Sequence, residues 1–145
     1  MNESAKSGRS TDTTRDEFGR IALHYAAADE NPELVAQLLR RGQDPSDRDR
    51  DGHTPLHLAA QYDNPEVLRL LLDAGADIDA RDSSGRTPLL TAVTSAWSGE
   101  QTVRLLRERG ADPRKKSANG SSPLRYVRRV DGPRWLKDAF ADLAD

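Results

Sequence analysis

GHTPLHLAA, residues 52–60, is the clearest copy of a phrase that occurs three times: residues 19–27 read GRIALHYAA and residues 85–93 read GRTPLLTAV. The glycines that open these copies are 33 residues apart, and a shorter copy, GSSPLRYV, follows at Gly120 after a step of 35 residues. Self-similarity at a fixed period of this size is typical of repeat proteins, in which each small unit packs on its neighbours. The chain is therefore expected to be a row of such units.

A second marker keeps the same period. The sequence reads GQDP at Gly42, GADI at Gly75 and GADP at Gly110, with steps of 33 and then 35 residues. Between the two markers of each unit lies an apolar phrase with helical spacing: PELVAQLLRRG, PEVLRLLLDAG or QTVRLLRERG. Each unit is thus predicted to hold two helices, one after the opening glycine and one before the closing glycine.

The second unit contains the residues that start and stop helices. Thr54 can cap a first helix that has Pro55 in its first position, where the missing N–H group costs nothing. Asn64 is expected to cap the second helix in the same way, and Asn-Pro-Glu at 31–33 repeats this start. Gly75 should end the second helix in a left-handed conformation, which costs other L-residues about 1–2 kcal/mol. The Asp-Gly and Ser-Gly pairs before the first helices indicate the turns of two-stranded fingers.

These phrases resemble the ankyrin repeat, and the 33-residue period in three registered copies makes the resemblance specific. It covers residue 16 to the end as four units, at 16–48, 49–81, 82–116 and 117–145, of which the last serves as a C-terminal cap. The resemblance implies an all-α ankyrin-repeat solenoid of helix-turn-helix units joined by β-hairpin fingers. Residues 1–15 are rich in Ser, Thr and charge, so we expect them to form a disordered polar tail.

Composition and charge narrow the classes of function. The 145 residues carry 22 Lys and Arg against 24 Asp and Glu, a near-neutral balance that argues against a nucleic-acid partner. Residues 101–145 hold half of the basic residues but only a quarter of the acidic ones, and we interpret this basic end as a solvated or protein-contacting face. There is no cysteine for a disulfide, and no apolar run reaches the roughly 18 residues of a membrane span. We expect a cytoplasmic protein without membrane contact.

The acidic run that begins at Asp47, DRDRDG, has the spacing that opens a calcium-binding loop. The twelfth position of such a loop should be a Glu, but counting from Asp47 it is Leu58, inside the expected first helix. The repeat offers another explanation, because Asp49 aligns with Asp16 and Asp82, each three residues before a finger glycine. We therefore expect these carboxylates to accept hydrogen bonds from the turn backbone, and we predict no metal.

The sequence shows no constellation for catalysis, and we predict that the chain is not an enzyme and holds no cofactor. His24 and His57 occupy the position that the ankyrin family uses for a structural hydrogen bond near the start of the first helix. His53 lies at a turn tip without a second ligand at metal-binding spacing. No serine lies in a nucleophile elbow, and no glycine-rich phosphate loop is present. A metal-dependent hydrolase is the remote alternative, which a deep pocket holding His53 and two carboxylates would favour.

In ankyrin proteins the partner usually contacts the finger tips and the concave face of the first helices. Carried over by position, the resemblance predicts the partner-binding residues Phe18, Arg20, Tyr25, Arg50, Asp51, His53, Gln61, Tyr62, Arg86, Thr94 and Ser95. Aromatic and Arg side chains most often carry interface energy, so the strongest anchors in this set are Phe18, Tyr25, Tyr62, Arg50 and Arg86. Phe18 and Tyr25 have a second interpretation, since they would also seal the exposed edge of the first unit.

The third and fourth units depart from the repeat. Two extra residues around TSAWSGE place Trp97 in a longer loop, where we favour a side chain that fills a gap between second helices over one that contacts a partner. The chain ends in GPRWLKDAFADLAD, which is expected to form a capping helix that packs on the stack. The apolar stripe of this helix is predicted to be Trp135, Leu136, Ala139, Phe140 and Leu143.

The resemblance implies a non-enzymatic protein-binding module that is a monomer when free. Richness in Arg, Asp and Ala and the compact four-unit form resemble small bacterial ankyrin proteins, some of which are similar to immunity proteins that neutralise a toxin. A free-standing adaptor or a regulatory subunit of another enzyme is the alternative. The expected partner is thus another protein, either a toxin or an enzyme.

Overall fold

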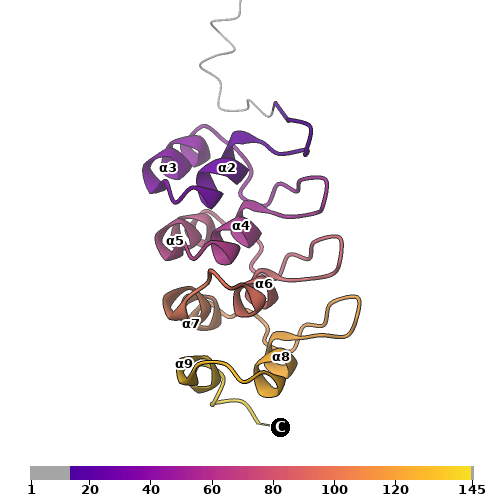
Figure 1. Ribbon diagram of the computed structural model, residues 1–145. Coiled ribbons are helices and arrows are strands. Elements are labelled where there is room, and N and C mark those ends of the chain that lie inside the picture. The colour runs from indigo at the N-terminus through magenta and orange to yellow at the C-terminus, as the bar shows by residue number, and fades with distance from the viewer. Residues whose placement is uncertain (1–13, 145) are drawn as a thin grey trace, which may run out of the picture.

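The computed structural model describes residues 14–144 and shows helix pairs stacked in a single row (Figure 1). The first helices of the units are α2 (Ala22–Ala28), α4 (Pro55–Gln61), α6 (Pro88–Thr94) and α8 (Pro123–Arg129). The second helices are α3 (Pro32–Arg40), α5 (Pro65–Asp73), α7 (Glu100–Glu108) and α9 (Arg134–Asp138). Each helix packs on its counterpart in the next unit, so the first helices form one layer and the second helices another. The predicted all-α repeat architecture is confirmed.

The fingers join one unit to the next and project on the side of the first helices (Figure 1). The expected β-hairpins are not confirmed, because no strand occurs within residues 14–144. Each finger is a turn instead, closed in the second unit by a hydrogen bond of 3.0 Å from the Gly52 N–H to the Asp49 carbonyl. Neighbouring fingers are linked by isolated backbone bonds, such as that from the Arg50 N–H to the Phe18 carbonyl at 2.9 Å. Such isolated bonds do not make the repeated ladder that defines a β-sheet.

The first helices start where the sequence predicts. The Thr54 hydroxyl accepts the His57 N–H at 3.3 Å, and Nδ1 of His57 accepts the Thr54 N–H at 3.1 Å. This reciprocal pair satisfies backbone donors that the start of a helix leaves unpaired. Thr87 and Ser122 cap α6 and α8 through their hydroxyls in the same position. The second, third and fourth units therefore share one local code for the start of their first helix, while Ile21 before α2 makes no side-chain cap hydrogen bond.

The starts of the second helices show one departure from expectation. Asn31 caps α3, since its Oδ1 accepts the Leu34 N–H at 3.2 Å. Asn64 occupies the same position before α5 and was expected to cap it, but its side chain does not bond to the helix. Its Nδ2 donates instead to the carbonyl oxygens of Ala27 and Ala28, at 2.6 and 3.3 Å, in the preceding unit. The buried Asn64 amide thus satisfies carbonyls that the end of α2 leaves free, and it links two units.

The core lies between the two layers of helices. Leu56 and Leu89 of the first helices and Leu71 and Leu106 of the second are fully buried. Burial of each such side chain contributes about 1.5–3 kcal/mol to folding. The short side chain of Ala59, also fully buried, lets the first helices approach closely. The first layer is thereby held at a fixed spacing, which sets the spacing of the fingers.

The C-terminal segment closes the last unit. Leu136, Ala139 and Phe140 are buried, while Trp135 and Leu143 pack partly buried against the core, so the predicted apolar stripe is confirmed. Its helix is shorter than expected, because α9 ends at residue 138 and the chain continues in turns. In the described range, no helix is long and apolar enough to cross a membrane.

Most of the predicted tail, residues 1–13, lies outside the described residues. Arg15, which we also assigned to the tail, forms an ion pair with Asp47. Its Nη1 and Nη2 lie 2.7 and 2.8 Å from the two carboxylate oxygens, and Nη1 also donates to the Gly19 carbonyl at 2.9 Å. This pair joins the chain before the first finger to the base of the second.

Candidate functional site

An aspartate braces each of the first three fingers. Oδ1 of Asp49 accepts the backbone N–H groups two and four residues later, both at 2.9 Å, as predicted. Asp16 and Asp82 hold their own fingers through the same pair of bonds. Burial alone would raise the pKa of Asp49, but hydrogen bonds from the Arg20 side chain and the His53 N–H outweigh it and hold this pKa below its ordinary value. The fingers are therefore preformed turns, which reduces the entropy lost when a partner binds.

His24 and His57 link each unit to the next finger. Nε2 of His57 lies 2.8 Å from the carbonyl oxygen of Arg86, and Nε2 of His24 lies 3.0 Å from that of His53. Because each Nδ1 accepts a backbone N–H, we assign both rings as neutral, with the Nε2 proton donated to that carbonyl. Burial lowers the pKa of His57 to about 4 and lowers the pKa of His24 as well. Both histidines are structural, as the resemblance implied.

His53 has a carboxylate on either side. Its Nδ1 lies 3.7 Å from Oδ2 of Asp49, and its Nε2 lies 3.3 Å from Oδ2 of Asp82. Three potential metal-ligand atoms, one each from Asp49, Asp51 and His53, lie within 4.8 Å of one another. The fold thus brings two carboxylates close to His53, which the sequence spacing did not reveal. Both Asp49 oxygens are already engaged, one by two backbone N–H groups and the other by Arg20 at 3.0 Å. A metal ion here would displace Arg20, and we interpret the cluster as a brace of the fingers.

The second and third units share a hollow of about 460 Å³ between their fingers and first helices. Five of the predicted partner-binding residues line it: His53, Gln61, Arg86, Thr94 and Ser95. The rest of its lining is Asp82, Ser84, Thr91, Ala96 and Trp97. Arg86 donates to the Thr94 hydroxyl, and the Ser95 hydroxyl donates to the Gln61 carbonyl at 2.7 Å. The hollow holds His53 with one carboxylate, which is one fewer than the arrangement that would favour a hydrolase.

Trp97 is the most exposed large apolar side chain among the described residues, at 72%. The expectation that it fills a gap between second helices is wrong. The extra residues form a loop after α6, in which the Ser95 hydroxyl oxygen accepts the Trp97 N–H at 3.1 Å and Trp97 joins the lining of the hollow. Where the loop ends and α7 begins, the buried Thr102 hydroxyl donates to Asp63 at 2.7 Å. The two extra residues in the sequence indicated an inserted loop. The side to which this loop carries Trp97 depends on hydrogen bonds that the sequence does not reveal.

Phe18, Arg20 and Tyr25 form a second group at the N-terminal edge. The Arg20 guanidinium carbon lies 5.8 Å from the centre of the Phe18 ring and 5.5 Å from that of Tyr25. The Tyr25 hydroxyl donates to Asp16, and this hydrogen bond raises the pKa of Tyr25. Phe18 and Tyr25 stay 55% and 38% exposed, so they cover the edge of the first unit only in part.

The remaining predicted residues lie along the same side of the molecule. Arg50 and Asp51 are exposed at the tip of the second finger, and Tyr62 is exposed at the end of α4. We call this side the finger surface. It consists of the fingers at 16–20, 49–53, 82–86 and 117–121, the outward side of α2, α4, α6 and α8, and the residues that follow α4 and α6, Tyr62 and residues 95–97.

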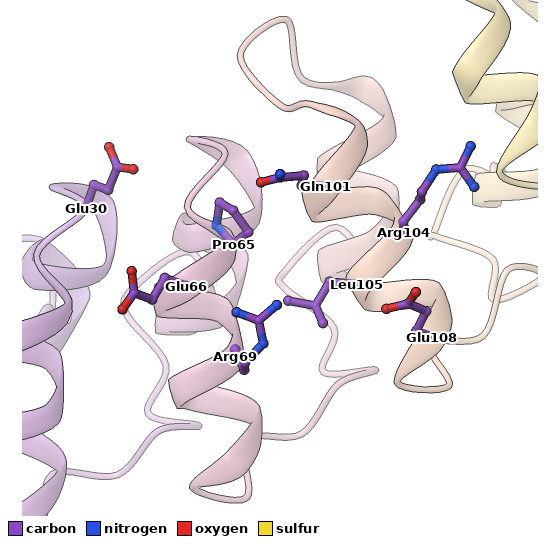
Figure 2. A pocket seen from close by; sticks show the side chains of 8 residues that line it. All are labelled: Glu30, Pro65, Glu66, Arg69, Gln101, Arg104, Leu105 and Glu108. Atoms are coloured by element: carbon purple, nitrogen blue, oxygen red, sulfur yellow. The ribbon is translucent and has the colours of Figure 1, made fainter.

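The repeat pattern did not indicate a groove on the opposite side, along the second helices. It has a volume of about 550 Å³ and is lined by Glu30, Pro65, Glu66, Arg69, Gln101, Arg104, Leu105 and Glu108 (Figure 2). Figure 2 shows charged side chains of both signs from α5 and α7 along it. Arg104 already pairs with Glu100 on its own helix at 2.7 Å. The lining has no aromatic residue of the kind that usually anchors a protein partner.

The repeated units and their fingers agree with a match to a known family. The family described as "Ankyrin repeats (3 copies)" matches residues 5–82 and 23–117. The chain belongs to the ankyrin repeat family. No curated protein matches it. Ankyrin repeats generally mediate protein–protein interactions and are typically binding modules without enzymatic activity. In this ankyrin repeat protein, α8 and α9 lie beyond the matched residues.

Proposed function

We propose that the chain is a non-enzymatic module that binds a partner protein through its finger surface. The observation that carries the proposal is the hollow between the second and third fingers, which gathers predicted contact residues from both units. Trp97, 72% exposed, belongs to the lining of the same hollow. A large aromatic side chain beside polar groups of fixed geometry is the composition that interface hot spots favour.

The size of the finger surface suits a protein partner. Packed helices lie about 10 Å apart, so four successive fingers extend over roughly 30 Å. That length corresponds to a standard interface, which buries about 800 Å² on each partner. The bracing aspartates and the linking histidines order this surface before a partner arrives, so little conformational entropy is lost on binding.

The finer role depends on the partner. As an immunity protein the chain would neutralise a toxin, and as an adaptor or regulatory subunit it would bind another enzyme. Both roles use the finger surface in the same way. The two roles differ in what the partner does when it is produced without the chain. A toxin then harms the cell, whereas a regulated enzyme does not.

A double charge reversal tests the proposal. Arg50→Glu with Arg86→Glu is expected to abolish capture of the partner from an extract of the source cell, while the circular dichroism of the helices stays unchanged. The matched control is Arg40→Glu with Arg69→Glu, which reverses two exposed charges on the second helices. Retained capture by the first variant would place the binding site on the second-helix side or on the C-terminal cap.

A further inference from the structure

One repeat position forms a ladder of contacts between a nitrogen-bearing side chain and a carboxylate of the next finger. The residue after each finger glycine is Arg20, His53, Arg86 or Ser121. Nε of Arg20 lies 3.0 Å from Oδ2 of Asp49, the bracing aspartate of the next finger. Nε2 of His53 lies 3.3 Å from Oδ2 of Asp82, the bracing aspartate of the finger after that. The first two rungs of the ladder are thus complete within the chain.

The third rung lacks its carboxylate. Ser117 takes the place of the bracing aspartate in the fourth finger, and its hydroxyl donates to Oδ1 of Asn119 at 2.6 Å within that finger. Arg86 forms no ion pair with any carboxylate in the described part of the chain. Its guanidinium donates to the Thr94 hydroxyl at the wall of the hollow. Because a guanidinium is always charged and its planar fork matches a carboxylate, Arg86 offers the hollow an unmatched positive charge.

We propose that the hollow binds an acidic segment of the partner protein, in which one carboxylate pairs with Arg86 and a neighbouring apolar side chain packs on Trp97. The inference rests on the proposed function and names the chemistry that the finger surface recognises. The partner's carboxylate would complete the third rung, which Ser117 leaves open. Arg86 and Trp97 both line the hollow, so one short segment can reach both.

The charges around the hollow favour a single carboxylate over a polyanion. Asp82 lines the same hollow, and Asp51 is exposed at the neighbouring finger tip, so a chain of phosphates would meet repulsion there. Residues 101–145, which follow the hollow in the stack, carry half of the Lys and Arg of the chain and attract acidic sequence. The 72% exposed Trp97 adds an apolar contact that a phosphate backbone would not use.

Ser117→Asp is the sharpest variant for testing this, because it supplies the missing carboxylate from the fourth finger and leaves Arg86 in place. Its carboxylate would accept the turn N–H groups, as Asp49 does, and pair with Arg86. The matched control is Ser117→Asn. An Asn side chain has the size of Asp and an oxygen that can accept the turn N–H groups, but it carries no charge. The two variants therefore differ only in whether the third rung is closed.

The probe is a display library of random dodecapeptides selected on the full-length chain, with the tightest clones synthesised and measured by fluorescence anisotropy. We expect the selected peptides to carry Asp or Glu next to an aliphatic or aromatic residue. Ser117→Asp and Arg86→Gln should each weaken their binding about tenfold or more, while Ser117→Asn and Arg69→Gln leave it unchanged. In the peptide, replacing the acidic residue by its amide (Asp by Asn or Glu by Gln) should weaken binding to the unaltered chain by the same factor. This amide peptide should bind Arg86→Gln no more weakly than it binds the unaltered chain.

Other outcomes separate this inference from the proposed function. Three outcomes would overturn the inference: the selected peptides have no acidic residue, no peptide binds above background, or neither Ser117→Asp nor Arg86→Gln changes the affinity of the peptides. If such peptides still lose affinity on Trp97→Ala, the finger surface remains the binding site and only its acidic specificity is wrong. Loss of affinity on Arg69→Gln with no effect of Trp97→Ala would contradict the proposed function itself.

Discussion

Nε2 of His57 lies 2.8 Å from the carbonyl oxygen of Arg86 in the next unit, while Nδ1 of the same ring accepts the Thr54 N–H at 3.1 Å. One neutral imidazole thus helps to start its own helix and holds the finger that carries Arg86. Protonation would add a second N–H where the ring must accept, and would place a charge in a buried site. The position of the finger surface is therefore coupled to the protonation state of a buried histidine.

The free energy of unfolding should fall as the pH drops from about 6.5 to about 4. Burial lowers the pKa of His57 to about 4 in the folded chain, against an ordinary value of 6.5 in the unfolded chain. Within this window the unfolded chain binds more protons, so acid favours unfolding, by about 1 kcal/mol between pH 7 and pH 5.5 from His57 alone. Urea unfolding at these two pH values measures the effect.

His57→Leu is the control for that measurement, because Leu90 occupies the same position in the third unit and is fully buried there. The variant loses the links to Thr54 and Arg86, which costs about 1–3 kcal/mol at neutral pH. Its stability should depend less on pH, with His24 responsible for the remainder. A pH dependence equal to that of the unaltered chain would show that His57 does not titrate in this range.

Asn64→Ala should destabilise the chain more than Asn31→Ala. Asn64 is buried, and its loss leaves the carbonyls of Ala27 and Ala28 without their side-chain donor, which costs about 1–3 kcal/mol. Asn31 is exposed and only caps α3, a contribution of about 1 kcal/mol. Thermal unfolding of the two variants compares them directly, and equal losses would rule out a special role for the Asn64 link.

Gly52→Ala should cost more stability than Gly75→Ala. Both glycines have positive φ, of +78° and +94°, so each substitution bears a strain of about 1–2 kcal/mol. A Cβ at Gly52 would lie 2.7 Å from the backbone nitrogen of Ser83 in the next finger, whereas one at Gly75 meets nothing within 4 Å. The fingers must therefore separate in the first variant alone. Denaturant titration should rank the two variants, and the reverse order would contradict this close approach.

Trp97→Ala should separate binding from folding. Since the side chain is 72% exposed, its removal should change the free energy of unfolding by less than about 0.5 kcal/mol. Removal of a hot-spot aromatic costs an interface about 2 kcal/mol or more, so partner affinity should fall by about thirtyfold. Calorimetry of unfolding and of partner binding provides both numbers. A large loss of stability would mean that Trp97 packs in the fold.

The regular parts of the fold could be predicted because each unit repeats its local code. Thr54, Pro55 and Gly75 have roles that depend on the residues immediately around them, and the structure agrees with all three. The candidate contact residues were carried over by position from the family resemblance, and three of them, His53, Gln61 and Arg86, line one hollow. That they contact a partner stays a prediction.

What the sequence could not reveal depends on contacts between units. Asn64 has the sequence context of a helix cap, but buried carbonyls of the preceding unit compete for its amide. The position of Trp97 could not be predicted, because a residue in an inserted loop has no equivalent position in the other units. The open third rung at Arg86 becomes visible only when Ser117 is compared, in space, with the aspartates of the other fingers.

Hydrogen exchange on the complex of the full-length chain with its captured partner tests the central claim most directly. We predict that binding slows exchange at the second and third fingers, residues 49–53 and 82–86, and in the loop that carries Trp97, while α5 and α7 exchange as in the free chain. Slower exchange confined to the groove between α5 and α7, with the fingers unchanged, would contradict the assignment of the finger surface as the binding site.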